Sequence, residues 1–263
     1  MESSESPAVL ASREGPVGTL TFSNAARRNA VSLPMLLQAD AALRDFAGDD
    51  AIRVVIVTGA GKDFVSGADI SRFESDRATQ DAIDRYNDTN ARVYGFVHDF
   101  PKPTIAMIRG YCIGGGLTLA MACDLRFAAE GARFALPAAK LGLGYGHTYL
   151  KWFMDVLGPA YTREVFFTSR QFDTAEALRM GMLNRALPDA ELAAFTQGYA
   201  ETIAGNAPLT IAAIKQASLE LLKGHEADLA LCKAMADRCW KSEDYIEGRR
   251  AFMEKRKPQW KGR

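Results

Sequence analysis

The sequence has no excess of charge of either sign. Its 32 Lys and Arg residues balance its 32 Asp and Glu residues, so no overall field favours nucleic acid or an acidic membrane surface. Long apolar runs are also missing, because the uncharged stretch Gly110 to Cys123 is too short and too rich in glycine to cross a bilayer. The first ten residues, MESSESPAVL, have neither the basic start nor the apolar centre of a secretion signal. These absences predict a cytoplasmic protein that binds neither nucleic acid nor membrane.

Cysteine is scarce and shows no metal-binding or redox spacing. The four cysteines, at positions 112, 123, 232 and 239, form no CxxC pair and no Cys/His pattern of the zinc type. We expect them to be reduced thiols. No redox or metal motif is found, so the sequence predicts no tightly bound flavin, nicotinamide or zinc.

The residues that are present follow the pattern of one large mixed domain. The chain has 263 residues, of which 48% are hydrophobic and 24% charged, which is ordinary for a globular protein. The run RVVIVTG (Arg53–Gly59) is typical of a strand buried on both faces. Strands and helices alternate up to about residue 190, and helical periodicity dominates afterwards. We therefore predict an α/β core over residues 1–190 and a helical segment over residues 191–263.

The predicted elements follow from hydrophobic period and turn residues. Predicted strands cover residues 8–12, 17–23, 53–59, 104–108, 124–129, 133–135 and 182–187. Predicted helices cover residues 33–46, 83–100, 117–123, 174–180, 190–204, 208–222, 226–240 and 242–256, with Asp173 or Thr174 as the N-cap of the fourth.

Two glycine-bearing loops stand out between strands and helices. GYCIGGGLT contains Gly114, Gly115 and Gly116 where a helix is expected to begin, although glycine costs a helix interior about 1 kcal/mol relative to alanine. It fits neither a P-loop nor a dinucleotide fingerprint, and the triplet by itself fits close packing of strand and helix equally well. KDFVSGADIS follows the strand RVVIVTG and contains Ala68. Backbone N–H groups from two such loops can form an oxyanion hole, in which each donor is worth roughly 3 kcal/mol.

Taken together, several motifs resemble the crotonase, or enoyl-CoA hydratase/isomerase, superfamily. They are ARRNAVSLPML, VVIVTGAGKDFVSGADI, KPTIAMIRGYCIGGGLTLAMACDLRFAAEGARFALPAAKLGLG, TAEALRMGMLNR and EGRRAFMEKRKPQWKGR. The resemblance implies a crotonase-like spiral of ββα turns, a helical C-terminal trimerisation segment in a homotrimer or homohexamer, and an acyl-CoA thioester as substrate. It also implies that the N–H groups of Ala68 and Gly115 hold the thioester oxygen while an enolate forms.

Coenzyme A is expected as part of the substrate and not as a resident cofactor. The resemblance implies contacts from two loops of one subunit and from the basic C-terminal helix of a neighbour. Residues 249–263 contain seven basic residues and one acidic residue, which suits a phosphate-rich ligand and equally a solvated terminal helix. The implied contacts are Arg28, Asn29, Ala30, Ser66, Ala68, Asp69, Ile70, Phe252 and Lys255.

The pattern departs from that of a hydratase at two positions. By resemblance, hydratases carry one glutamate two residues after the third glycine and another directly after the proline of a later turn. This sequence has Thr118 and Ala138 there. Threonine can position water but is no base near neutral pH, and alanine does neither.

Replacement acid/base groups are expected on the loop LGLGYGHTY. Tyr145 and His147 are the candidates, because histidine titrates near the working pH and a tyrosine hydroxyl can orient a carboxylate or a water. Packing is an equally plausible role for His147 and a slightly favoured one for Tyr145. The sequence thus predicts an acyl-CoA-processing enzyme of the hydratase/isomerase group with unusual acid/base residues. An acyl-CoA decarboxylase, a hydrolase, or a non-catalytic acyl-CoA-binding protein are the alternatives.

Overall fold

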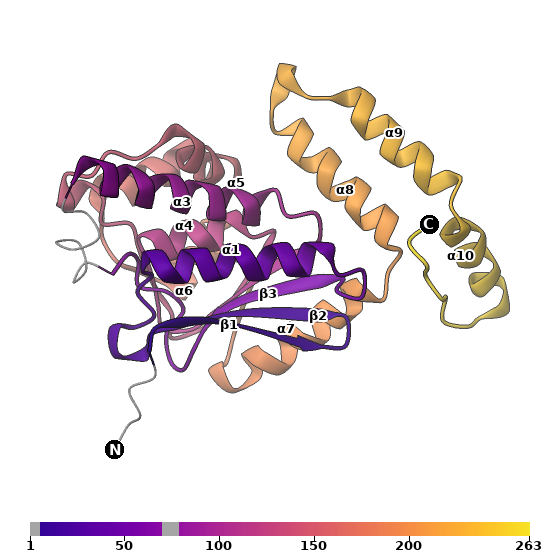
Figure 1. The fold of residues 1–263 in the computed structure, drawn as a ribbon, viewed down its shortest axis with the longest axis horizontal. Coiled ribbons are helices and arrows are strands. Elements are labelled where there is room, and N and C mark those ends of the chain that lie inside the picture. The colour runs from indigo at the N-terminus through magenta and orange to yellow at the C-terminus, as the bar shows by residue number, and fades with distance from the viewer. Residues whose placement is uncertain (1–5, 70–78) are drawn as a thin grey trace.

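A mixed β-sheet forms the centre of the fold (Figure 1). The computed structural model describes residues 6–69 and 79–263, and within them the largest sheet has six strands in the order β1-β2-β3-β4-β6-β9. β1 and β2 pair antiparallel as a hairpin, and the other neighbours pair in parallel. The strands are β1 (Ala8–Glu14), β2 (Val17–Ser23), β3 (Val54–Gly59), β4 (Thr104–Ile108), β6 (Leu125–Ala129) and β9 (Arg185–Leu187).

A smaller sheet lies beside the first and contains strands that sequence pattern did not indicate. Within the described residues its order is β5 (Tyr111–Ile113), β7 (Arg133–Ala135) and β8 (Phe172–Asp173). β5 is three residues long and runs directly into the glycine triplet. Three residues are too few to show the alternation of apolar and polar residues that marks a strand. The predicted α/β class is confirmed, with β5 and β8 as additions.

Both faces of the large sheet are covered by helices. Val55 and Val57 of β3 belong to the main core, against α1 (Leu33–Gly48) and α3 (Gln80–His98). Val54 and Ile56 point to the opposite face, where α7 (Asp189–Ala204) packs. This alternation follows from the two-residue period of a strand. It confirms that the RVVIVTG strand is buried on both faces.

Three further helices lie between strands of the small sheet or between the two sheets. α4 (Gly115–Ala122) leads from β5 to β6, and α6 (Thr174–Arg179) leads from β8 to β9, so both connect the small sheet to the large one. α5 (His147–Thr168), 22 residues long, connects β7 to β8 within the small sheet, and 3₁₀ turns lie at 25–27, 139–141 and 224–226. The Asp173 side chain accepts a hydrogen bond of 2.8 Å from the Glu176 N–H, so Asp173 is the N-cap of α6. α4 begins at the second glycine of the triplet, two residues before the predicted start.

The last three helices form a separate layer that extends away from the sheets (Figure 1). They are α8 (Pro208–Leu221), α9 (Leu229–Trp240) and α10 (Glu243–Glu254). Because α7 packs on the sheet, the chain leaves the core near residue 205, later than the predicted boundary at 190.

All four cysteines are free thiols. No helix of the described chain combines the length and apolarity that a bilayer crossing requires.

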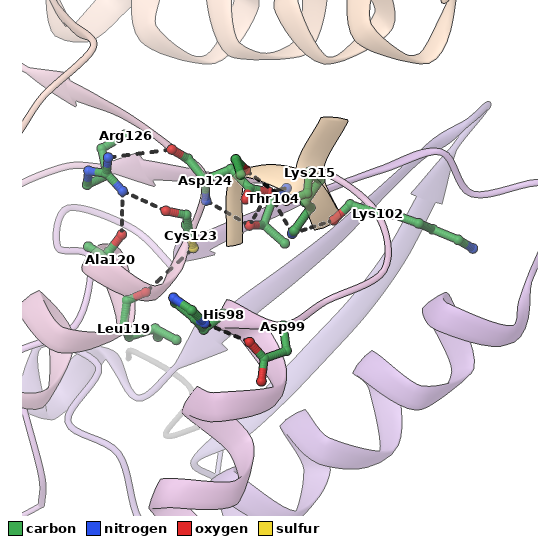
Figure 2. A network of polar contacts seen from close by, with 11 residues as sticks. His98, Asp99, Lys102, Thr104, Leu119, Ala120, Cys123, Asp124, Arg126 and Lys215 are labelled. Carbon is green, nitrogen blue, oxygen red and sulfur yellow. Dashed lines mark hydrogen bonds and ion pairs between the residues drawn. The ribbon is translucent and has the colours of Figure 1, made fainter. Parts of the chain in front are cut away.

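An ion pair joins this helical layer to the core (Figure 2). The Lys215 Nζ of α8 lies 2.8 Å from the Asp124 Oδ2 and donates a further bond of 3.0 Å to the Lys102 carbonyl. The same Asp124 oxygen accepts from the Thr104 N–H at 2.7 Å. The Lys215 side chain is 9% exposed. A buried ammonium group in this position fixes the first helix of the layer against the ends of β4 and β6.

Loss of the Lys215 amine should therefore destabilise the fold. We expect Lys215→Met to lower the free energy of unfolding by about 2 kcal/mol, because the half-buried Asp124 carboxylate loses its charged partner and the Lys102 carbonyl loses a donor. Urea denaturation measures this change. Lys233→Met is the matched control: its pair with Asp237 is exposed and should contribute less than about 1 kcal/mol. Equal effects of the two substitutions would contradict the assigned role of Lys215.

Candidate active site

The N-terminus of α4 is built on a glycine with positive φ. Gly114 is the N-cap, with φ +56°, and its N–H donates to the Ala135 carbonyl at 2.8 Å. Its own carbonyl accepts the first helical bond, from the Thr118 N–H at 3.1 Å. The Gly115 N–H is the first donor of the helix and has no acceptor within α4. The positive end of the helix dipole lies at the same place.

A second loop is held against this helix end by close backbone contact. A Cβ on Gly116 would stand 2.0 Å from the Val65 carbonyl oxygen, so only glycine fits there. That same oxygen accepts from the Ile113 N–H at 3.0 Å. Loop 64–69 therefore lies directly along the start of α4.

The loop turns at Gly67, which has φ +103°. Its carbonyl accepts from the Val31 N–H at 2.8 Å, and the Asp69 N–H donates to the Val31 carbonyl at 3.0 Å. A Cβ built on Gly115 would lie 3.9 Å from the Gly67 Cα, so the two loops meet here. Within residues 6–69 and 79–263, neither the Ala68 N–H nor the Gly115 N–H donates a hydrogen bond. Sequence motifs 47 residues apart thus place two unused backbone donors near each other.

Thr118 lies one turn farther along α4, and its hydroxyl meets that of Tyr145 from the loop before α5. The Thr118 Oγ1 lies 3.3 Å from the Gly114 carbonyl oxygen and forms a hydrogen bond with the Tyr145 hydroxyl. Thr118 is 1% exposed, and Ala138, the other position where a hydratase glutamate is expected, is 7% exposed. The structure therefore brings Thr118 and Tyr145 together, and neither side chain carries a charge.

Aromatic rings surround the Tyr145 hydroxyl. The ring packs edge-on against Phe166 and Tyr149, with centroids 5.0 Å and 5.8 Å away. Burial raises the pKa of Tyr145 to about 12, even though the hydrogen bond to Thr118 acts in the opposite direction. The Tyr149 hydroxyl accepts a bond of 3.1 Å from the Asn90 amide. The hydroxyl groups of Thr118, Tyr145 and Tyr149 are therefore neutral donors and acceptors at physiological pH.

His147 has a different setting from Tyr145. It is the first residue of α5 and is exposed, and no hydrogen bond to its ring is found among the described residues. Tyr145, two residues earlier in the sequence, belongs to the loop before α5. Its role in proton transfer stays a prediction.

The predicted coenzyme A contacts of the first loop lie side by side. Ser66 donates through its N–H to the Arg28 carbonyl at 3.1 Å, and the Arg28 guanidinium stacks on Tyr111 at 4.3 Å. Asn29 is fully buried, and its amide donates to three backbone carbonyls, of residues 60, 63 and 64. The Asn29 side chain thus fastens this loop to the end of β3.

The remaining predicted contacts fall in three places. Ala30 is 6% exposed, and Asp69 is buried with its carboxylate 3.9 Å from the Arg27 guanidinium. Ile70 lies outside the described residues. Phe252, 83% exposed, and Lys255 lie on and just after α10, in the separate helical layer. Their contact with coenzyme A stays a prediction.

Tyr94 is a residue near the site that sequence reasoning missed. Its hydroxyl oxygen lies 3.5 Å from the position of a Cβ on Gly115, although the residue belongs to the C-terminal part of α3. In the sequence, Tyr94 shares a helical face with Val93 and Val97, and this pattern indicates packing alone. Only the crossing of α3 over α4 reveals its position.

Known proteins match this chain over almost its whole length. The family model for enoyl-CoA hydratase/isomerase matches residues 12–263. The chain belongs to the enoyl-CoA hydratase/isomerase family. It is 30% identical over 254 residues to the short-chain-enoyl-CoA hydratase of Clostridium acetobutylicum, covering 95% of both chains. It is 33% identical over 262 residues to the carnitinyl-CoA dehydratase of Salmonella typhimurium, covering 95% of this chain and 97% of that one.

Solved structures of the enoyl-CoA hydratase/isomerase family confirm the predicted crotonase-like fold. An enoyl-CoA hydratase/isomerase family protein from Hyphomonas neptunium superposes with a TM-score of 0.92 at 30% identity, covering 97% of this chain and 98% of that chain. An enoyl-CoA hydratase/carnitine racemase from Magnetospirillum magneticum superposes with a TM-score of 0.90 at 33% identity. The match covers 97% of this chain and 96% of that chain. Family membership supports an enzyme that processes acyl-CoA.

The tyrosine cluster of this site predicts a pH dependence. Burial raises the pKa values of Tyr94, Tyr145 and Tyr149, whereas an unfolded chain ionises tyrosine near about pH 10. The unfolded state then binds fewer protons than the native state above this pH, so stability is kept below pH 10 and falls as pH rises toward 12. Tyrosinate absorbance followed with circular dichroism should show these tyrosines ionising only as the chain unfolds. Tyr145→Phe should remove one ionisation from that step, and native-state titration of all three near pH 10 would contradict the burial argument.

Proposed function

We propose that this protein acts on an acyl-CoA thioester by stabilising its enolate, and that it is not a fast hydratase. The observation that supports the first half is that the loop of Ala68 lies against the start of α4 at Gly115, and that the N–H groups of both residues have no acceptor in the described chain. Two converging amide donors at a helix N-terminus suit a thioester oxygen that gains negative charge. Family membership supplies the substrate class.

Enolate stabilisation needs this pair of donors. A proton acceptor is needed as well when the enolate forms by loss of a proton. As the α-carbon loses a proton or a carboxylate, its electron pair moves into the bond to the carbonyl carbon, and the oxygen becomes an anion. Fixed N–H donors stabilise this anion more than the neutral carbonyl, which lowers the barrier. We place Ala68 and Gly115 in this role.

The second half of the proposal rests on Thr118 and Ala138. Hydration requires a base that activates water and an acid that delivers a proton to the α-carbon. Thr118 carries a hydroxyl that is bonded to Tyr145, and Ala138 carries a methyl group. Neither replaces a carboxylate. Tyr145, held neutral by burial, can donate a proton or orient a substrate group, and His147 is the proposed exchanger of protons if it turns toward the substrate.

Decarboxylation of a malonyl-type thioester is the second candidate, and the neutral Thr118–Tyr145 pair favours it. In this reaction the bond from the α-carbon to the carboxylate breaks, its electrons form the enolate, and carbon dioxide leaves. A proton from water or Tyr145 then reaches the α-carbon. The reaction needs the oxyanion donors but no strong base. Isomerisation, hydrolysis, and binding without turnover are the other outcomes that a substrate screen distinguishes.

A homotrimer or homohexamer is proposed to complete the coenzyme A site. The three C-terminal helices surround a cavity of about 690 Å³, and several large apolar side chains on them are exposed. Examples are Ile214, Trp240 and Phe252, at 65%, 65% and 83% exposure. Such surfaces favour contact with another subunit. Phe252 and Lys255 would then meet the adenine and phosphates of coenzyme A bound mainly to a neighbour.

A turnover screen tests the proposed chemistry. Crotonyl-CoA mixed with the purified protein should keep its conjugated-thioester absorbance, because Thr118 and Ala138 provide no hydrating pair. Mass spectrometry across enoyl-, malonyl-type and aryl-CoA thioesters should identify a thioester that is converted. Loss of crotonyl-CoA absorbance at ordinary hydratase rates would contradict the proposal, and tight binding of several thioesters without turnover would favour a binding protein.

Gly115→Pro tests the oxyanion donor with that thioester. Position 115 is the first of α4, where proline is tolerated, so the substitution removes the N–H while the helix remains. We expect turnover to fall at least about 100-fold, with an unchanged thermal midpoint as the control for folding. His147→Ala should lower turnover if His147 moves the proton, and unchanged turnover would leave it a structural residue.

A further inference from the structure

The Tyr94 hydroxyl is buried and has no hydrogen-bond partner among the described residues. Tyr94 is 2% exposed. Within residues 6–69 and 79–263, the fully buried side-chain oxygens that lack a partner are the Asp40 Oδ1 and the Thr162 Oγ1. The Tyr94 hydroxyl oxygen is not among them. Because it has no partner, it is not fully enclosed by protein atoms, and a small ligand atom can reach it.

Neighbouring tyrosines do have partners. Tyr86, two turns earlier on α3, donates to the Val31 carbonyl at 3.3 Å. Tyr149 accepts from Asn90, and Tyr145 pairs with Thr118. Buried hydroxyl groups are normally paired in this way. The contrast indicates that the partner of Tyr94 comes from outside the described chain.

The space in front of Tyr94 is next to the proposed oxyanion donor. A Cβ on Gly115 would have two neighbours within 4 Å: the Tyr94 Oη at 3.5 Å and the Gly67 Cα at 3.9 Å. Gly115 has no positive φ in this structure, so glycine is not required there by backbone conformation. Its missing side chain leaves a space the size of one small group, bounded by the Tyr94 hydroxyl and the loop of Ala68.

We propose that Tyr94 is a further catalytic residue, whose hydroxyl donates a third hydrogen bond to the ligand oxygen held by Ala68 and Gly115. This proposal rests on the proposed enolate chemistry. Tyr94 adds a side-chain donor from α3 to two backbone donors from separate loops. The substrate class that benefits is a thioester whose enolate is less readily formed.

The chemistry of the phenol suits this role. Tyr94 approaches the anion as a neutral donor, because burial raises its pKa well above the ordinary value. It therefore keeps its proton throughout, and its ring is held edge-on to Tyr149 at 6.4 Å. A donor fixed in a buried site needs little rearrangement as negative charge develops.

A β-ketoacyl-CoA such as acetoacetyl-CoA tests the proposal without knowledge of the natural substrate. Its enolate absorbs in the near ultraviolet, so a pH titration of the bound ligand gives an apparent pKa for enolate formation. We expect Tyr94→Phe to raise this pKa by about one unit, a tenfold loss of enolate stabilisation. Affinity for the keto form and the thermal midpoint should stay unchanged, because the lost hydroxyl has no protein partner.

Controls separate this proposal from the proposed function. Tyr199→Phe, on α7 beside Phe127, should leave the pKa of the bound ligand unchanged. If the wild-type protein fails to lower this pKa below its value in water, the proposed enolate chemistry is wrong. If the wild type lowers it and Tyr94→Phe matches the wild type, Tyr94 is no donor. Should Tyr94→Phe unfold, 3-fluorotyrosine at position 94 replaces it: a more acidic phenol should lower the pKa further, and no change would overturn the proposal.

Discussion

The contact between the Val65 carbonyl and Gly116 is the constraint on which the site depends. A Cβ at position 116 would lie 2.0 Å from that oxygen, so the loop and α4 can come this close only through glycine. The contact fixes the loop that contains Ala68 against the end of the helix that contains Gly115. Two glycines of the triplet then have a backbone reason of their own: Gly114 has a positive φ, and Gly116 permits this close approach.

The other end of α4 is held as firmly as its start. The buried Arg126 guanidinium donates to the Cys123 carbonyl at 2.6 Å (Figure 2). It also donates to the Met182 carbonyl at 2.7 Å. A positive charge at a helix C-terminus stabilises the helix. α4 is therefore fastened at both ends while its first N–H is left unused. A short helix held in this way can present a donor to a ligand with little loss of entropy on binding.

Sequence reasoning predicted most of the fold because its signals are local. The β3 run and the helical period of α1 are long enough to recognise, and the motifs around Ala68 and Gly115 indicated the family. The short strands β5 and β8 lack such periods. Tyr94 and the Thr118–Tyr145 pair could not be predicted as neighbours, since they meet only where α3, α4 and the loop before α5 converge. The place of α7 on the sheet likewise depends on tertiary packing, which moves the end of the core toward residue 205.

The electronic state of a bound thioester carbonyl tests the central claim most directly. Butyryl-CoA labelled with ¹³C at this carbon, bound to the protein, reports the polarisation of the carbonyl by its NMR chemical shift. Donors aimed at the oxygen should move the signal downfield of its position in water, and removal of the Gly115 N–H should return it. A bound carbonyl with the same shift as in water would contradict the account, because the Ala68 and Gly115 groups would then not act on the oxygen.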